Sequence, residues 1–295
     1  MRSRFPNKWL PYLLLLPTLA LCAIFLYYPV IQTFRLSTYR AILMGLHRKY
    51  VGFENYVRLF TSSDYIHSLT ITFIFAVGVV VLGLSISLAI ALLANHKIKG
   101  ARFYRLLLIW PYALSPAVAG SIWLFLLNPT AGVVNYFMKS LFGISPDWLT
   151  DGRLALLAVT IAAMWKNLGY NIVFFLAGLQ NLPGEILEAA KVDGAGPWTT
   201  FWRVTFPLLS PTTFFLLIMN LIYAFFGGFG LIMVMTEGGP NKATNILIFN
   251  LYQDAFRFHK WGLAAAQSVI LFIMVVALTL IQFRTTGRRV HYGGQ

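Results

Sequence analysis

The chain has 295 residues, of which 58% are hydrophobic and 11% are charged, and its mean hydropathy is +0.71. These values exclude an ordinary soluble globular protein and indicate a chain that lies largely within a bilayer. The formal net charge of +14 comes from basic residues that flank apolar segments, a pattern typical of helix anchors at a membrane surface rather than of nucleic-acid binding.

Membrane-spanning helices are predicted from segments without charged residues, because a spanning helix needs about 20 mostly apolar residues. Segments 9–34, 65–96, 106–138, 204–236 and 261–283 contain no Lys, Arg, Asp or Glu, and segment 154–182 is interrupted only by Lys166. The sequence therefore predicts an all-α membrane protein with six transmembrane helices and both termini on one side. We see no internal repeat or long linker and expect a single domain over residues 1–295.

The orientation is predicted from the basic residues, which are enriched in short cytoplasmic loops. With a cytoplasmic N terminus, the inner segments hold Arg2, Arg4, Lys8, Lys97, Lys99, Arg102, Arg105, Lys191, Arg203, Arg284, Arg288 and Arg289. Most of the acidic residues then lie outside, at Glu54, Asp64, Asp147, Asp151, Glu237 and Asp254. We expect both termini and the loop over residues 183–207 to be cytoplasmic.

The first three predicted spans differ in their proline and small-residue content. Pro17 predicts a bend in the first span, and Cys22 lies in a run that continues to Phe34, so we interpret this run as a retained helix rather than a cleaved signal. The third span contains Pro111 and Pro116, and such interruptions are tolerated where a helix faces protein or a water-filled cavity. Small residues in the second span favour close helix packing, at Gly78, Gly83, Ser85, Ser87 and Ala89.

The fourth span contains Lys166, which lies on the order of 18 Å beyond Arg153 at about 1.5 Å of rise per residue. An isolated charge near mid-membrane costs about 2.5–3.5 kcal/mol on insertion scales, so the lysine should face a cavity or a partner. Two interpretations stay open: Lys166 binds an anionic substrate, or it pairs with a carbonyl or a partner subunit. Neighbouring side chains offer stacking surfaces and hydrogen bonds, at Trp165, Asn167, Tyr170 and Asn171.

The loop over residues 183–207 is predicted to contain two short helices and a sharp turn. Residues 185–192 are good helix formers, Gly194 can close the first helix in the left-handed conformation, and the Gly196-Pro197 pair suits the start of a second helix. Aromatic residues then recur at helical spacing, at Trp198, Phe201 and Trp202.

The fifth and sixth spans carry scattered polar groups in apolar surroundings. The fifth contains Asn220, Tyr223 and the Gly227-Gly228 pair. In the sixth, Gln267 either reaches a cavity or bonds a neighbouring helix, and we favour the second interpretation.

The spacing Glu188-Ala189-Ala190, Gly194 and Val204-Thr205-Phe206-Pro207 resembles the E-A-A-x3-G-x9-I-x-L-P loop of permease subunits in bacterial ATP-binding-cassette (ABC) importers. Val204 and Phe206 depart from that motif but remain apolar. The resemblance extends from about Pro11 to Arg284 and looks closest to the A-type permeases of sn-glycerol-3-phosphate importers. The stretches that most resemble those A-type permeases include Pro111-Tyr112-Ala113, Ser115-Pro116-Ala117-Val118-Ala119 and Ala265-Ala266-Gln267-Ser268-Val269.

This resemblance implies the type I ABC importer permease fold, with six transmembrane helices and a cytoplasmic coupling helix, in the inner membrane of a bacterium. It implies a second homologous permease, an ABC ATPase dimer and a periplasmic or lipid-anchored substrate-binding protein. The coupling residues would be Glu188, Ala189, Ala190, Asp193, Gly194 and Pro207. The substrate-binding residues would be Trp165, Lys166, Asn167, Tyr170, Asn171 and Tyr223.

The implied substrate is sn-glycerol-3-phosphate or a related glycerophosphodiester, and the alternative is a neutral di- or oligosaccharide. Where maltose-type relatives have sugar-binding asparagines, this chain has Gly227-Gly228, which counts against a maltose-like substrate. No G-x-x-x-x-G-K-[ST] phosphate loop occurs, so we expect no ATP hydrolysis by this chain, no catalytic residues, no cofactor and no metal site. A gradient-driven secondary transporter is less favoured because every Asp and Glu lies in a predicted loop.

Overall fold

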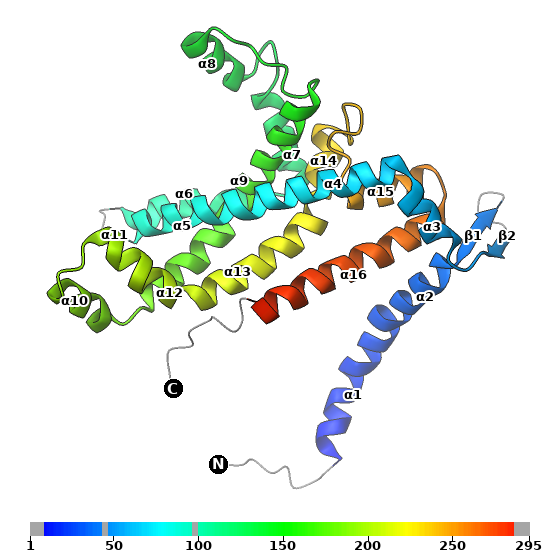
Figure 1. The fold of residues 1–295 in the computed structure, drawn as a ribbon, viewed down its shortest axis with the longest axis horizontal. Coiled ribbons are helices and arrows are strands. Elements are labelled where there is room, and N and C mark those ends of the chain that lie inside the picture. The colour runs from blue at the N-terminus through cyan, green and yellow to red at the C-terminus, as the bar shows by residue number, and fades with distance from the viewer. Residues whose placement is uncertain (1–8, 43–46, 96–99, 286–295) are drawn as a thin grey trace. The chain divides into compact units, whose positions relative to one another are not determined.

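The computed structural model describes residues 9–42, 47–95 and 100–285, which are almost entirely helical apart from one two-stranded hairpin (Figure 1). Several basic residues used for the predicted orientation lie outside the described residues, namely Arg2, Arg4, Lys8, Lys97, Lys99, Arg288 and Arg289. The chain divides into two compact units, Met1–Ser63 with Leu251–Phe272 and Asp64–Asn250 with Ile273–Gln295. The single permease domain over residues 1–295 stays a prediction.

Five described helices are long and apolar enough to cross a membrane: Leu10–Ser37, Ser63–Ala94, Gly152–Gln180, Ser210–Gly227 and Trp261–Thr285. Two shorter helices, Phe103–Ala113 and Pro116–Leu126, meet the same criterion together but are bent by 104°. With this bent pair counted as one span, the described residues contain the six spans that the sequence predicts.

The first unit contains the first span, a hairpin and the beginning of the last span. Its elements are α1 (Leu10–Cys22), η1 (Ala23–Tyr27), α2 (Tyr28–Ser37), β1 (Tyr39–Ile42), β2 (His47–Tyr50), α3 (Glu54–Thr61), η6 (Gln253–Arg257) and the first part of α16 (Trp261–Thr285); α15 (Leu247–Tyr252) ends in it. The hairpin pairs β1 with β2 antiparallel, with Tyr39 opposite Tyr50. The sequence predicts only a connection between the first two spans here, because each strand has four residues, too few to show an alternating pattern.

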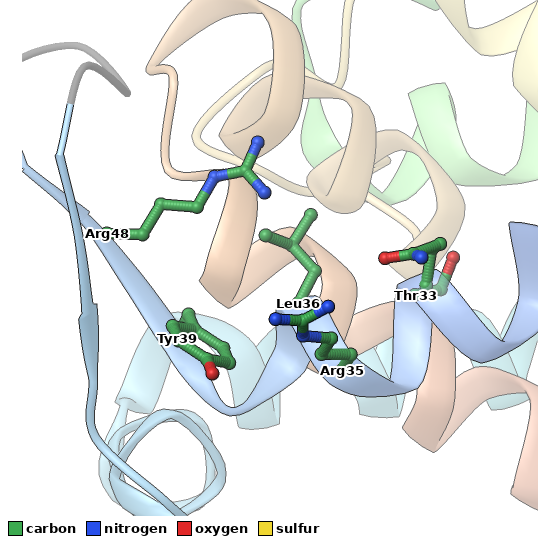
Figure 2. A pocket seen from close by; sticks show the side chains of 6 residues that line it. Thr33, Arg35, Leu36, Tyr39 and Arg48 are labelled. Atoms are coloured by element: carbon green, nitrogen blue, oxygen red, sulfur yellow. The ribbon is translucent and has the colours of Figure 1, made fainter.

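A hydrogen-bonded joint connects the hairpin to α3. The Nδ2 atom of Asn55, which is buried, donates to the carbonyl oxygens of Ser37 at 2.8 Å and of Tyr39 at 2.9 Å. Beside the hairpin lies a cavity of about 340 Å³, where Arg48 extends from β2 towards α2 and Arg35 lies on α2 near Tyr39 (Figure 2).

The second unit is built around α9 (Gly152–Gln180). Its other elements are α4 (Ser63–Val77), η3 (Gly78–Leu82), α5 (Gly83–Ala94), α6 (Ala101–Ala113), α7 (Pro116–Leu126), α8 (Val133–Phe142), α10 (Gly184–Val192), α11 (Pro197–Thr200), η4 (Phe201–Thr205), α12 (Phe206–Leu208), α13 (Ser210–Ile222), η5 (Tyr223–Gly227), α14 (Phe229–Met235), the first part of α15 and the last part of α16. Helices α5 and α6 pack along α9. A buried cluster from α5, α9 and the α12–α13 segment forms a core of Ala91, Phe175, Leu179, Leu209 and Leu216.

Small residues allow these helices to approach closely. A Cβ atom added at Gly78 would lie 2.8 Å from Thr160 Cγ2 on α9, and one added at Gly169 would lie 2.8 Å from the backbone of Ile109 on α6. The packing role that the sequence predicts for the small residues of the second span therefore has a direct geometric basis at Gly78.

The bend between α6 and α7 follows from the two prolines. Helix α6 ends just after Pro111, where the N–H of Leu114 donates to the Pro111 carbonyl at 3.2 Å. Ser115 caps the next helix, its Oγ accepting from the N–H of Val118 at 3.2 Å, and Pro116 occupies the first helical turn. Helices α8 and α10 lie towards opposite ends of α9 (Figure 1).

Candidate substrate site and coupling loop

Lys166 lies at the middle of α9, and only 8% of its surface is exposed. Among the described residues it makes no ion pair; its Nζ atom instead lies 5.5 Å from the centroid of the Tyr112 ring on α6. An ammonium group over an aromatic face gains a modest electrostatic attraction, which leaves most of the cost of burying the charge uncompensated. The structure therefore places an under-compensated cation inside a predicted span.

Three asparagines form a buried hydrogen-bond cluster next to this lysine. Asn220 on α13 accepts at Oδ1 from Asn167 Nδ2 at 2.7 Å and from Asn171 Nδ2 at 3.0 Å. The Nδ2 atom of Asn220 donates to Asn171 Oδ1 at 2.7 Å and to the Leu216 carbonyl at 2.8 Å. This asparagine cluster fixes α13 against α9 and holds both α9 asparagines in one orientation.

Aromatic side chains from three helices surround the rest of the site. The Trp165 ring makes edge contacts with Trp110 at 6.4 Å and Trp123 at 5.9 Å between centroids. The Tyr170 ring lies 5.4 Å from that of Tyr112. These contacts give the site a wall from α6, α7 and α9 that can stack on an apolar or sugar-like surface.

Tyr223 approaches α9 from η5. Its hydroxyl donates to the Ala163 carbonyl at 3.4 Å, and its ring lies over Gly227, where an added Cβ atom would lie 2.4 Å from Cδ2 of the ring. A larger residue at position 227 would displace Tyr223. The glycine that the sequence analysis noted as a departure from maltose-type permeases thus makes room for this tyrosine.

Five of the six predicted substrate-binding residues lie on α9, and Tyr223 reaches that helix from η5. The substrate-binding residues predicted from the sequence did not include Tyr112, Trp110 or Trp123. Asn220 was noted only as a polar residue of the fifth span. An asparagine within an otherwise apolar segment was the one available signal for Asn220, since such a residue needs a polar partner. Gln267, which we expected to bond a neighbouring helix, is buried and donates from Nε2 to Asp254 Oδ2, in η6, at 2.6 Å.

The predicted coupling loop forms two helices joined by a tight turn. Helix α10 spans Gly184–Val192, and Gly194 follows with φ of 76° in the left-handed region. The N–H of Ala195 donates to the Ala190 carbonyl at 3.0 Å, and that of Gly194 to the Lys191 carbonyl at 3.1 Å. This pair of bonds is the Schellman helix end, so the turn predicted at Gly194 is confirmed.

Most of the remaining predicted coupling residues are exposed, and an apolar cavity lies beside them. Glu188, Ala189 and Asp193 are exposed, whereas Pro207 lies in the short helix α12. Gly196 precedes α11 and Pro197 opens it, as the sequence predicts. An apolar cavity of about 600 Å³ lies behind α11, lined by Leu92, Lys191, Ala195, Pro197, Trp198, Thr200, Phe201 and Thr205. The Val192 and Trp198 side chains are among the most exposed large apolar groups, so this end of the unit offers apolar surface to a partner.

The bent pair, the long α9 and the loop helices define a multi-pass membrane permease. The chain belongs to the family of binding-protein-dependent transport system inner membrane components, which it matches over residues 83–291.

Three relatives share the name sn-glycerol-3-phosphate transport system permease protein UgpA. The chain is 46% identical to that of Agrobacterium fabrum over 289 residues, 98% of each chain. It is 45% identical to that of Rhizobium meliloti over 292 residues, 99% of each, and 42% identical to that of Yersinia enterocolitica over 291 residues, 99% of this chain and 98% of the other. These relatives are transport permeases and not enzymes.

Two solved structures share the fold. A chain of a bacterial ABC transporter involved in the import of the acidic polysaccharide alginate is 23% identical, with a TM-score of 0.82 over 95% of this chain and 96% of that one. A chain of the alginate transporter in complex with a periplasmic protein bound to an alginate pentasaccharide is also 23% identical, with a TM-score of 0.84 over 97% and 96% of the two chains. The predicted fold, that of a type I ABC importer permease, is confirmed.

Proposed function

We propose that the chain is the permease subunit of an ATP-driven importer that moves sn-glycerol-3-phosphate, or a related glycerophosphodiester, across the cytoplasmic membrane. Relatives at 42–46% identity over nearly the whole chain carry the name of that transport system. The observation that carries the substrate assignment is Lys166, a buried cation without a carboxylate partner among the described residues. A phosphate ester would supply the missing negative charge.

The proposed substrate contacts are of three kinds: a charge on the phosphate, aromatic rings against the glycerol part, and amides held in a fixed position. Lys166 binds the phosphate, while Trp165, Tyr170 and Tyr223 contact the glycerol part. Asn167 and Asn171 line the site with amides that Asn220 holds in place. In this assignment, the role of the asparagine cluster is to keep the polar surface rigid while the solute passes.

The proposed energy input comes from a separate ABC ATPase dimer that docks on the loop over residues 183–207. Glu188 makes a polar contact with the ATPase, Ala189 and Ala190 allow its surface to approach α10, and Gly194 sets the angle between α10 and α11. A second homologous permease completes the cavity, and a periplasmic or lipid-anchored binding protein delivers the substrate. Both termini are cytoplasmic in this arrangement.

ATP-dependent uptake by the assembled importer in proteoliposomes tests the substrate. We expect uptake of radiolabelled sn-glycerol-3-phosphate and little uptake of maltose. Lys166→Ala should lower the uptake of the phosphate ester by about tenfold or more, as expected for the loss of one charge-assisted contact, whereas Lys166→Arg should retain most of it.

Lys139→Ala is the matched control, because Lys139 is an exposed lysine on the distant helix α8. Faster uptake of maltose than of the phosphate ester would refute the substrate. A Lys166→Ala importer that loses thermal stability but still transports the ester at the unmodified rate would assign the lysine a purely structural role.

A further inference from the structure

The cavity beside the β1–β2 hairpin, called here the hairpin cavity, lies apart from the residues assigned to transport. It has a volume of about 340 Å³ and is lined by Gln32, Thr33, Arg35, Leu36, Tyr39 and Arg48. Figure 2 shows Arg48 reaching from β2 towards α2, and Arg35 beside Leu36 and Tyr39. The lining therefore includes two guanidinium groups, which stay charged at physiological pH, and no carboxylate of the described residues. A concave surface of this composition is suited to an anion.

Neither arginine is neutralised within the described part of the chain. Arg35 and Arg48 make no ion pair there. The described part of the first unit contains two acidic residues, Glu54 and Asp254, and both form ion pairs with other basic residues. The hairpin cavity thus holds two positive charges that an external anion can neutralise.

Arg35 is positioned by an aromatic ring. Its Cζ atom lies 5.9 Å from the centroid of the Tyr39 ring. The Tyr39 ring in turn makes an edge contact with that of Tyr50 on the opposite strand, at 5.4 Å between centroids. A guanidinium group over a ring is attracted through its face, whereas its N–H donors lie in its own plane. The contact with Tyr39 therefore leaves the donors of Arg35 available to an oxyanion.

The backbone that carries the two arginines is fixed by hydrogen bonds. Asn55 Nδ2 donates to the carbonyl oxygens of Ser37 and Tyr39, and the N–H of Val51 donates to the Thr38 carbonyl at 2.9 Å. These bonds hold the end of α2 and the start of β1 against the segment that follows β2. A frame that is already ordered loses little conformational entropy when a ligand binds.

The hairpin cavity adjoins the apolar surface of the first predicted span, Leu10–Ser37. Arg35 lies in the last turn of α2, at the end of this span. None of the most apolar stretch of the span is buried against the rest of the described chain. Ile31 is 64% exposed and Phe34 is 42% exposed, and both lie within about one helical turn of Arg35. A cationic cavity and an uncovered apolar helix surface are thus continuous.

We propose that the hairpin cavity binds the headgroup of an anionic phospholipid, with Arg35 and Arg48 on its phosphate and the acyl chains along α1 and α2. The donors of arginine match the geometry of a phosphate group. A lipid fits better than a free anion because it covers the adjoining apolar surface as well as the charge. Tyr50 and Phe53 are 66% and 76% exposed, and aromatic side chains are enriched at the level of lipid headgroups. Only the side of the membrane, the periplasmic one, rests on the proposed function.

Native mass spectrometry of the purified, fully assembled importer tests this site by titration with phosphatidylglycerol or, for comparison, phosphatidylcholine. Arg35→Gln and Arg48→Gln should each weaken the binding of the most tightly held phosphatidylglycerol by about tenfold, as expected for the loss of one charge-assisted contact. Phosphatidylcholine should depend much less on the two arginines, because its choline group balances its phosphate. Both side chains are exposed, so these substitutions remove charge without opening the core.

Lys49→Gln is the matched control. Lys49 follows Arg48 in β2 and is also exposed, but successive side chains of a strand point to opposite faces. This variant should bind phosphatidylglycerol as the unsubstituted importer does. Arg48→Lys keeps the charge and should bind phosphatidylglycerol more tightly than Arg48→Gln.

A second measurement separates a lipid from a free anion. It is the equilibrium binding of radiolabelled inorganic phosphate in a detergent without anionic lipid, in a Lys166→Ala background so that the central lysine does not contribute. We expect phosphate binding to be the same with and without Arg35→Gln or Arg48→Gln. A loss confined to inorganic phosphate would overturn the lipid in favour of a free anion.

Equal phosphatidylglycerol binding by Arg35→Gln, Arg48→Gln and the unsubstituted importer would overturn the proposal, and so would an equal loss in Lys49→Gln. An equal loss of both lipids would overturn the requirement for a negatively charged headgroup. Because no transport is measured, a failure of the substrate assignment leaves these outcomes unaffected.

Discussion

At the scale of single residues, Asn220 hydrogen-bonds two of the predicted substrate-binding residues, although it was not one of the six predicted from the sequence. Its amide takes part in four hydrogen bonds, to Asn167, to the Leu216 carbonyl and, twice, to Asn171. It is fully buried, so water cannot replace a lost partner. Unsatisfied buried amides cost about 1–3 kcal/mol each.

We expect Asn220→Ala to lower the unfolding temperature of the purified complex and to weaken substrate uptake, because Asn167 and Asn171 lose their shared partner. Thermal unfolding monitored by fluorescence, together with the apparent KM of uptake, measures both effects. Asn181→Ala is the control, since Asn181 is exposed at the end of α9. An Asn220→Ala complex with unchanged stability and KM would contradict the role of Asn220 in positioning Asn167 and Asn171.

Sequence patterning could not assign this cluster, although it identified each asparagine. Hydrophobic patterning indicates that a polar side chain in a span needs a partner, but it does not say which one. The partner of Asn171 lies 49 positions further along the chain, and only the packing of α13 on α9 brings it near. The distance from Arg153, at a constant rise per residue, predicted Lys166 well inside the fourth span, and Lys166 lies at the middle of α9.

At the scale of elements, the sequence predicted helices more reliably than their junctions. The boundaries of α10 and α11 follow from glycine and proline, whose backbone preferences are local. The bend of 104° between α6 and α7 also begins at prolines, but the sequence does not indicate its size. The hairpin was missed because each of its two strands has only four residues, too few to show an alternating pattern.

The turn after α10 makes a prediction for coupling. Gly194 has positive φ and open space around the position of a Cβ atom, so a side chain there is strained by the backbone and not by a clash. We expect Gly194→Asp to uncouple ATP hydrolysis from uptake in proteoliposomes, because the angle between α10 and α11 changes. The ratio of phosphate released to substrate transported measures this coupling.

Gly196→Asp separates backbone strain from added charge. Gly196 has φ of −67° and is also open, and an aspartate suits its position before α11. We expect this variant to stay coupled. Gly194→Asn should also retain part of the coupling, since asparagine tolerates the left-handed region. Equal coupling in Gly194→Asp and in the unsubstituted importer would refute the role assigned to the turn.

At the scale of the whole molecule, the proposed orientation rests on the distribution of basic residues, several of which lie outside the described chain. It can be tested directly because the sequence contains one cysteine, Cys22. In a Cys22→Ser background, new cysteines at exposed threonines report the side of the membrane. Thr130→Cys precedes α8, and Thr199→Cys lies in α11.

In intact spheroplasts, we expect a membrane-impermeant maleimide to label Thr130→Cys but not Thr199→Cys. Both should be labelled once the membrane is permeabilised, which controls for accessibility of the two thiols. Labelling of Thr199→Cys alone in intact spheroplasts would reverse the orientation and place the predicted coupling loop on the periplasmic side.

The prolines of the bent pair have one more effect on the span that they interrupt. Proline lacks an N–H, so Pro111, which lies inside α6, leaves the carbonyl of Leu107 without its usual helical donor, whereas Pro116 opens α7, where no helical bond is lost. The Leu107 oxygen belongs to the main chain, and no exchange of its own side chain removes it. A backbone acceptor of this kind stays available to a polar partner while the surrounding side chains diverge.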